Sequence, residues 1–174
     1  MTAAHVVVED IDRDVVRLGA GDAHHLGAAL RLRPGEEVSA TDGGGGWRLY
    51  RWEGGGLLNA VSAPTFSERP SPPLTVGFAP VKGERPEWAV QKLTELGIDR
   101  ILVLRTARGV VRWGPPQVER MRRVARQALM QSRGVWLPAV EGPVDFCEAI
   151  RLPGAALADP GGGPVWVGCT VVLV

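Results

Sequence analysis

The sequence has little cysteine and no long apolar run, and each shortage excludes a class of protein. Cys147 and Cys169 are its two cysteines. Neither belongs to a Cys-x-x-Cys motif or lies near a histidine cluster, so we expect buried thiols and no bound metal, rather than a zinc site or a disulfide framework. No basic and then apolar leader follows Met1, and no apolar run is long enough to span a bilayer, which predicts a cytoplasmic protein without a membrane segment.

Lysine is scarce as well, and neither sign of charge is in clear excess. Lys82 and Lys92 are the only lysines, while lysine and arginine together number 20 against 19 aspartates and glutamates. The resulting net charge of +1 does not predict a charged partner. The distribution of the arginines is therefore more informative than their number.

Residues 1–68 have the pattern of a small β-barrel. Short apolar or alternating runs, separated by glycine, aspartate and proline, predict strands at residues 5–8, 15–18, 37–41, 47–52 and 57–61. Asp22 is the predicted N-cap of one helix over residues 23–30. Four prolines between Ala63 and Pro73 predict a linker, after which residues 69–174 form a second domain of the α/β class.

The second domain opens with a predicted strand, helix and strand. Apolar runs at residues 74–81 and 98–104 are typical of buried parallel strands. Pro86 suits a first helical turn and Gly97 suits a helix end, so we expect a helix over residues 86–96. Its packed face is predicted to consist of Ala89, Val90, Leu93 and Leu96. Such a βαβ unit predicts a parallel sheet with a right-handed crossover.

A second helix is predicted from Pro115 to Ser132. Its apolar stripe is Val118, Met121, Ala125, Ala128 and Leu129. Arginines crowd the remaining surface, namely Arg120, Arg122, Arg123, Arg126 and Arg133, and Glu119 is the only acid near them in the sequence. Neighbouring like charges on a helix repel by about a few tenths of a kcal/mol per pair. A bound polyanion would relieve this repulsion, and a solvated helix face is the alternative.

The C-terminal part predicts a helix over residues 144–150 and strands at 155–158, 165–167 and 170–174. The glycines that follow Asp159 lack the Lys-Ser/Thr of a P-loop and the helix of a dinucleotide-binding fingerprint. An α/β enzyme for a small phosphorylated ligand would need an anion-binding glycine loop before a helix. This reading therefore has no support from the sequence.

Several motifs recur in one protein family. They are Lys82-Gly83-x-Arg85, Gln91-Lys92-x-Thr94-Glu95-Leu96-Gly97, Arg108 in the loop after the second strand, and Gln131-Ser132-Arg133. In this set the chain resembles the bacterial 16S rRNA uracil-N3 methyltransferases, which belong to the SPOUT class of trefoil-knotted, S-adenosylmethionine-dependent enzymes. His24-His25 and Leu30-Arg31-Leu32-Arg33-Pro34-Gly35 are similar to the motif of the family's PUA-like RNA-binding barrel.

The resemblance implies a homodimer that methylates N3 of a uridine in 16S rRNA of the small ribosomal subunit. It implies a catalytic role for Arg108, which its place after a strand also favours, and RNA contacts by Arg31, Arg33, Lys82, Arg85, Lys92 and Arg133. The crowding of arginines on the predicted second helix adds Arg122 and Arg126 to the expected RNA contacts. The resemblance also implies cofactor contacts by Leu157, Ala158, Asp159 and Val174, with Gln91, Glu95 and Gln131 orienting their neighbours. Because N3 of uracil carries a proton at neutral pH, the site must stabilise the uracil anion or assist deprotonation, and it must receive an unstacked base.

Alternatives remain open for the paired arginines and histidines of the first domain. Arg31 and Arg33 flank Leu32, so both guanidiniums can project toward phosphate while the leucine packs. Two solvated arginines at a helix C-terminus are the competing interpretation. A structural role is favoured over a catalytic one for His24 and His25, because no carboxylate or nucleophile lies at a recognisable spacing.

The sequence departs from the family pattern at single positions and at its end. Ala107 and Gln127 stand where the family usually has glutamate, Gly109 where it has serine, and Gly134 where arginine is frequent. In the family, a last apolar strand leads into a Gly-Pro-Glu-Gly-Gly loop and a Leu-Gly-x-x-Ile-Leu-Arg segment that hold the cofactor, and this sequence stops at Val174 before both. We therefore expect the 174-residue form to bind the cofactor poorly, and an RNA-binding module without catalysis is the alternative function.

Overall fold

The computed structural model describes residues 2–164 and 168–174. The chain divides into an N-terminal unit, Met1–Arg69 with Met130–Trp136, and a C-terminal unit, Pro70–Leu129 with Leu137–Val174. A segment far along the sequence, 130–136, thus belongs to the N-terminal unit. The predicted strand at residues 165–167 lies outside the described residues.

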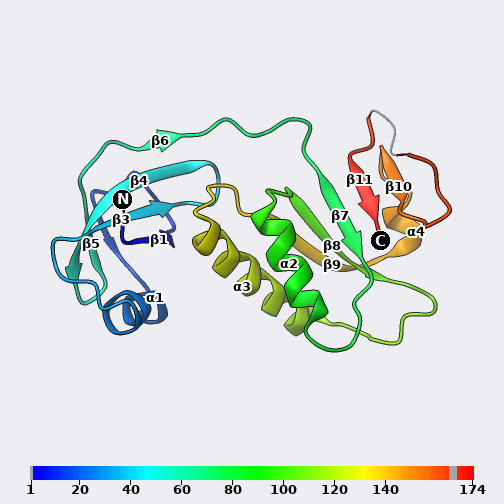
Figure 1. Ribbon diagram of the computed structural model, residues 1–174, viewed down its shortest axis with the longest axis horizontal. Coiled ribbons are helices and arrows are strands. Elements are labelled where there is room, and N and C mark those ends of the chain that lie inside the picture. Colours follow the sequence, from blue (N-terminus) through cyan, green and yellow to red (C-terminus); the bar gives the residue numbers. More distant parts are fainter. Residues whose placement is uncertain (1, 165–167) are drawn as a thin grey trace. The chain divides into compact units, whose positions relative to one another are not determined.

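The N-terminal unit is built on a six-stranded sheet (Figure 1). Its strands are β1 (Ala4–Val7), β2 (Val15–Arg17), β3 (Glu37–Thr41), β4 (Gly46–Gly54), β5 (Leu57–Ala60) and β6 (Thr65–Phe66). The order is β1-β3-β4-β5-β2, with β6 paired to β4; β1 and β3 are parallel and the other pairs antiparallel. The predicted strands are confirmed, and β6 is an additional strand within the segment predicted to be a linker.

Buried and exposed residues alternate along the strands, and the buried side chains of one sheet face form a single core. On β4, Tyr50 and Trp52 are buried while Arg51 and Glu53 are exposed. The Tyr50 hydroxyl donates a hydrogen bond to the Ile11 carbonyl at 2.9 Å, so the buried phenol keeps a polar partner. Full burial of a large apolar side chain contributes about 1.5–3 kcal/mol, which makes such positions the main stabilising contacts of the unit.

The helical segment of the N-terminal unit begins earlier than predicted. Helix α1 (Ala20–His24) continues into a π-helical turn, η1 (His25–Ala29). Gly19 is the N-cap, so the prediction that Asp22 caps the helix is wrong. Asp22 lies in the first turn instead, where a negative charge favours the helix dipole. Leu26 holds the segment against the core.

The C-terminal unit has a five-stranded parallel sheet of order β10-β11-β7-β8-β9. Its strands are β7 (Thr75–Phe78), β8 (Arg100–Arg105), β9 (Ala139–Asp145), β10 (Ala155–Leu157) and β11 (Val171–Leu173). Its helices are α2 (Arg85–Glu95), α3 (Pro115–Ser132, whose last turn lies in the N-terminal unit) and α4 (Phe146–Ala149). The predicted βαβ unit and the two long helices are confirmed.

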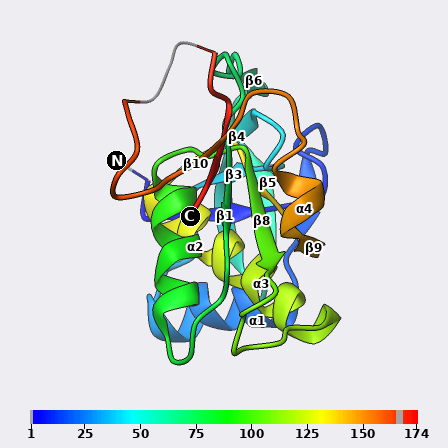
Figure 2. The same cartoon turned by 90° about the vertical axis from the view of Figure 1, so that its right-hand side faces the viewer.

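Helices cover both faces of this sheet, with α2 on one side of β8 and α4 on the other (Figure 2). Val90 of α2 and Met121 of α3 pack with Ile101 of β8 in one core cluster. Leu102 and Leu104 of β8 point to the opposite face of the sheet from Ile101, and they pack in a second cluster with Ala149 of α4. The predicted apolar stripe of α3 is confirmed, because all five of its residues are buried.

Strand β9 was not predicted, because Gly142 and Pro143 interrupt its apolar pattern. Pro143 is compatible with β9 because β9 is an edge strand of this sheet. Gly142 has φ +139°, and a Cβ placed there would lie 2.7 Å from the Val103 carbonyl oxygen, so a side chain is excluded. Val144, predicted to begin a helix, belongs to β9, and α4 starts after Asp145.

Two burial predictions are wrong. Leu96 is 77% exposed because it is the C-cap of α2 and lies beyond the packed face. Cys147 is exposed on α4, whereas Cys169 is partly buried, and both are free thiols.

Candidate active site

A cleft of about 1260 Å³ opens on the C-terminal unit where its parallel strands end. Ala79 and Pro80, which follow β7, line it, together with Thr106 after β8 and Leu157 at the end of β10. In the sheet, β8 and β9 lie on one side of β7, and β11 and β10 lie on its other side. A parallel sheet binds ligands outside the carboxyl ends of its strands at such a reversal of strand order, so the cleft is the candidate active site.

The loop between β8 and α3 supplies Arg108, the predicted catalytic residue. Arg108 is exposed and lines the cleft. A turn in which the Gly109 N–H donates to the Thr106 carbonyl at 3.1 Å shapes the loop around it. Three further arginines line the same cleft, namely Arg105, Arg112 and Arg151, and no sequence motif predicted them as site residues.

Arg105 joins the ends of two strands at the cleft wall. Its Nε lies 2.9 Å from Asp145 Oδ1 and its Nη2 lies 2.6 Å from Asp145 Oδ2, a bidentate pair between residues that are partners in the β8–β9 register. These hydrogen bonds lower the pKa of Asp145 and raise that of Arg105. Asp145 is also the N-cap residue of α4, yet its side chain makes no capping hydrogen bond.

The predicted cofactor residues lie at the ends of β10 and β11. Leu157 is 52% exposed and lines the cleft. The Ala158 N–H donates to the Leu173 carbonyl and the Val174 N–H donates to the Gly77 carbonyl, each at 2.8 Å, so both residues continue the sheet. Oδ1 of Asp159 accepts from the Gly161 N–H at 2.7 Å in a tight turn.

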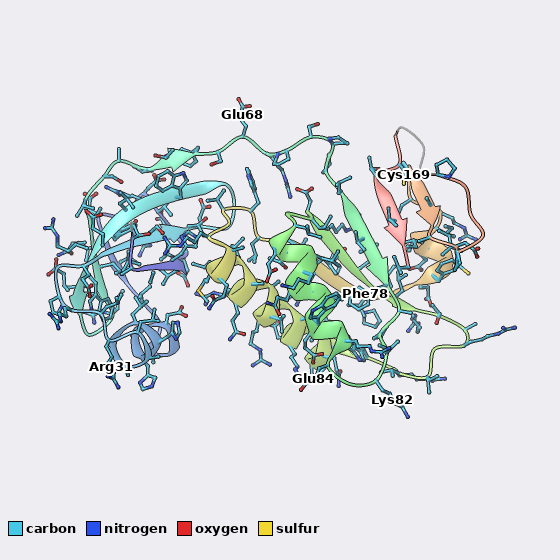
Figure 3. The ribbon with its side chains drawn as sticks, in the orientation of Figure 1. Arg31, Glu68, Phe78, Lys82, Glu84 and Cys169 are labelled. Atoms are coloured by element: carbon cyan, nitrogen blue, oxygen red, sulfur yellow. The ribbon has the colours of Figure 1, made fainter. Side chains whose placement is uncertain are left out.

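On α2, the predicted orienting residues contact a predicted RNA-binding residue. Glu95 accepts a hydrogen bond from Gln91 Nε2 at 2.8 Å and forms an ion pair with Lys92 Nζ at 2.6 Å. The contact with Lys92, followed by that with Gln91, lowers the pKa of Glu95. Lys82 projects outward from the preceding loop (Figure 3), and Arg85 is exposed at the start of the helix.

The arginines of α3 have more acidic neighbours than the sequence suggested. Arg122 pairs with Glu119 at 3.0 Å, as proximity in the sequence allows. Arg120 pairs at 2.9 Å with Glu87, which comes from α2, so the interpretation of Glu119 as the only nearby acid is wrong. Part of the repulsion predicted along α3 is therefore relieved within the protein.

In the N-terminal unit, Arg31 and Arg33 are exposed on either side of Leu32, which packs against the core. Arg31 has φ 54°, a left-handed conformation that turns the chain after η1. Arg133 also has a positive φ, 56°, and donates to the Thr2 hydroxyl at 2.6 Å and the Thr2 carbonyl at 2.9 Å. Arg133 therefore has a structural contact that competes with any role toward RNA.

The remaining predicted side chains of the N-terminal unit, Gln131, His24 and His25, are exposed. The buried histidine is His5, which sequence reasoning did not single out. It hydrogen-bonds Ser39 and the Gly134 carbonyl, and it thereby attaches the segment after α3 to β1 and β3.

Phe146, Cys147 and Glu148 also line the cleft and were not predicted. They lie on or beside the four-residue helix α4, and no motif marks them. They could be found only from their position at the start of a helix that directly follows a strand, and this position is recognised only once β9 is known. Among the described residues, no group of histidine, cysteine, aspartate or glutamate could hold a metal ion, and no helix is long and apolar enough to cross a membrane.

Comparisons with known proteins match both units. A family model described as RNA methyltransferase domain matches residues 67–158, more than half of the 174 residues, and one described as RNA methyltransferase PUA domain matches residues 18–54. Ribosomal RNA small subunit methyltransferase E of Synechocystis sp. is 32% identical over 150 residues, covering 84% of this chain and 49% of that protein. The protein of the same name from Mycobacterium tuberculosis is 38% identical over 141 residues, covering 75% and 53%. The chain thus spans about half the length of the curated relatives it matches.

Solved structures share the fold across nearly the whole chain. Ribosomal RNA small subunit methyltransferase E from Neisseria gonorrhoeae, bound to S-adenosyl methionine, has a TM-score of 0.81 at 21% identity and covers 98% of this chain and 78% of its own. The crystal structure of a predicted RNA methyltransferase from Thermotoga maritima has a TM-score of 0.78 at 20% identity, with coverage of 98% of this chain and 80% of its own. The predicted fold class, a PUA-like barrel followed by a SPOUT-type α/β domain, is confirmed.

Proposed function

The chain belongs to the RNA methyltransferase domain family, and from this premise we propose that it transfers a methyl group from S-adenosylmethionine to N3 of a uridine in 16S rRNA of the small ribosomal subunit. The observation that carries the proposal is the cleft at the strand ends, whose wall bears Arg108. The relatives named ribosomal RNA small subunit methyltransferase E support the choice of RNA.

The cleft has the chemistry that this cofactor requires. Trp113, Phe146 and Leu157 offer apolar surface for the adenine ring, and Glu148 offers a carboxylate that attracts a positively charged group. We assign cofactor contacts to Leu157, Ala158, Asp159 and Val174, all at or just beyond the ends of β10 and β11. When bound, S-adenosylmethionine supplies the methyl group and departs as S-adenosylhomocysteine.

Arg108 is the proposed catalytic residue. Uracil N3 must lose its proton before or during methyl transfer, which places negative charge on the ring. A guanidinium remains protonated throughout and donates hydrogen bonds in a fixed fork, so Arg108 would stabilise this charge where it develops. Gln91, Glu95 and Gln131 orient neighbouring groups in this proposal, and the hydrogen bonds of Glu95 to Gln91 and Lys92 support such a role on α2.

RNA contacts are proposed on both units. Residues 1–68 act as a PUA-like RNA-binding domain through Arg31 and Arg33, supported by the match to the PUA model. Residues 69–174 act as the SPOUT-like catalytic domain. Its proposed RNA-binding residues are Lys82, Arg85, Lys92, Arg122, Arg126 and Arg133, the last of which lies in the segment 130–136 that belongs to the N-terminal unit of the structure. We also propose that the protein is a homodimer in the cytoplasm and that it acts on the small ribosomal subunit.

The reaction is tested with small ribosomal subunits that lack the modification. N3-methyluridine cannot form a Watson–Crick pair, so reverse transcription of the treated rRNA stops at the modified position. We expect a stop that depends on S-adenosylmethionine, and a rate about 10²-fold lower for Arg108→Gln. Arg100→Gln is a matched control, because Arg100 lies at the opposite end of β8. If no stop forms while the chain still binds the subunits, the protein is an RNA-binding module without catalysis.

A further inference from the structure

Three guanidinium groups line the cleft and have no side-chain partner among the described residues. Arg108, Arg112 and Arg151 are exposed and line it, and in the part of the chain that the structure describes none of them forms a hydrogen bond or an ion pair through its side chain. Arg105, in the same wall, is by contrast neutralised by Asp145. Unpaired arginines that border one cavity favour an anionic ligand.

The charge balance of the cleft also favours an anionic ligand. Its lining includes four arginines against two carboxylates, Asp145 and Glu148, so two positive charges are uncompensated. S-adenosylmethionine carries a positive sulfonium, a positive ammonium and one negative carboxylate, so the bound cofactor adds one further positive charge to this excess. The charge of the cleft therefore favours a second ligand that is negatively charged.

The size of the cleft allows such a second ligand. A pocket for one small molecule usually measures about 300–1,000 Å³, whereas this cleft has a volume of about 1260 Å³. It can hold a cofactor and part of a nucleotide together. A nucleotide of an RNA strand carries a phosphodiester on each side of its ribose, so it brings two of the negative charges that are lacking.

We propose that Arg112 and Arg151 form a phosphate clamp, in which each guanidinium binds a phosphodiester next to the nucleotide that enters the cleft. Arg112 comes from the loop after β8 and Arg151 from the residues after α4, so the two cations reach the cleft from separate elements. Guanidinium binds phosphate through two parallel hydrogen bonds, which fixes position as well as charge. The inference rests on the proposed function and adds to it the recognition of an unstacked, single-stranded segment at this cleft.

Cys147 provides a local probe of the cleft, because it is exposed and lines the cleft wall. Its alkylation by iodoacetamide is followed by peptide mass spectrometry, with Cys169 as the internal reference. The ligand is a short oligouridylate, compared with the same oligomer carrying uncharged methylphosphonate linkages. Binding to the oligouridylate is measured separately by fluorescence anisotropy over a range of salt concentrations.

We expect the oligouridylate, but not its uncharged analogue, to slow alkylation of Cys147 in the unaltered chain. In the Arg112→Gln/Arg151→Gln variant, protection should need at least about tenfold more RNA, and the slope of log affinity against log salt should fall by about 1.4, since each contact with single-stranded phosphate contributes about 0.7. The Arg112→Lys/Arg151→Lys variant should keep most of the salt dependence, because it keeps both charges. Arg100→Gln should behave like the unaltered chain.

Equal protection and an equal salt slope in the double glutamine variant would overturn the clamp. Binding seen by anisotropy without protection of Cys147 would also overturn it, because the oligouridylate would then bind on another surface. Absence of any oligouridylate binding would reject the clamp, and the reverse-transcription assay on ribosomal subunits would decide the proposed function separately.

Discussion

The buried imidazole of His5 makes the stability of the N-terminal unit depend on pH. The side chain is 8% exposed, its Nδ1 lies 2.8 Å from Ser39 Oγ, and its Nε2 lies 3.0 Å from the Gly134 carbonyl oxygen. Because a carbonyl can only accept, Nε2 carries the proton, and Nδ1 accepts from the Ser39 hydroxyl. Burial lowers the pKa of His5; the hydrogen bond to Gly134 opposes this in part, and the Arg133 guanidinium lowers the pKa further.

The sign of the pH effect follows from the lowered pKa. In the unfolded chain His5 titrates near its ordinary value of 6.5, while in the folded protein it stays neutral at lower pH. The stability contributed by neutral His5 is therefore complete above pH 6.5. It is lost as the pH falls below that value, because the unfolded state binds the proton first, and the loss ends once the folded pKa has been passed.

Urea unfolding of the wild type and of His5→Gln between about pH 8 and pH 5 tests this reasoning, since carboxylates titrate mainly below that range. At the alkaline end, His5→Gln should cost about 0.5–1.5 kcal/mol for each hydrogen bond that glutamine fails to replace. Toward the acid end the variant should lose less stability than the wild type. His24→Gln/His25→Gln, at exposed positions, is the matched control and should keep the wild-type pH dependence. An identical pH dependence in His5→Gln and wild type would refute the assignment.

Three further outcomes follow from the packing of the C-terminal unit. Met121→Ala, at a position that is 1% exposed between α3 and the sheet, should lower the free energy of unfolding by about 2–5 kcal/mol in urea titrations. Gly142→Ala should destabilise by more than about 1 kcal/mol by the same measurement, because φ is +139° and the added Cβ would meet the Val103 carbonyl. Arg105→Gln should leave the urea midpoint unchanged, because its ion pair with Asp145 is exposed, while NMR titration should show the pKa of Asp145 rising toward its ordinary value.

The elements that the sequence predicted correctly are those in which local signals and packing agree. Helix α3 has a proline start and an apolar stripe with helical period, and all five predicted stripe residues are buried. Helix α2 was predicted to within one residue at each end, yet Leu96 was assigned to its packed face because periodicity does not show where a helix leaves the sheet. Strand β9 was missed because its Gly142 and Pro143 resemble a turn. The close approach of Val103 on β8 explains Gly142, and the position of β9 at the edge of the sheet explains Pro143.

The candidate site was less predictable than the fold, because its residues come from distant parts of the sequence. Arg108 could be singled out by a motif and by its place after a predicted strand, and it does line the cleft. Phe146, Cys147 and Arg151 join the same cleft only through the pairing of β9 with β8 and the short helix that follows. No spacing rule relates these residues to Arg108. The order of strands in the sheet, which brings them together, depends on contacts between segments far apart in the chain.

The arginines of α3 and those of the cleft could both bind RNA, and they differ in whether an acidic side chain already pairs with them. Arg120 and Arg122 on α3 already pair with Glu87 and Glu119, so a phosphate must displace a carboxylate to bind either one. Arg112 and Arg151 at the cleft have no such competitor among the described residues. Since counterion release depends on positive charge that is not already neutralised by the protein, the cleft arginines should contribute more to salt-dependent RNA binding than these two arginines of α3. Counting arginines along the sequence pointed to α3, whereas their pairing in the folded chain points to the cleft.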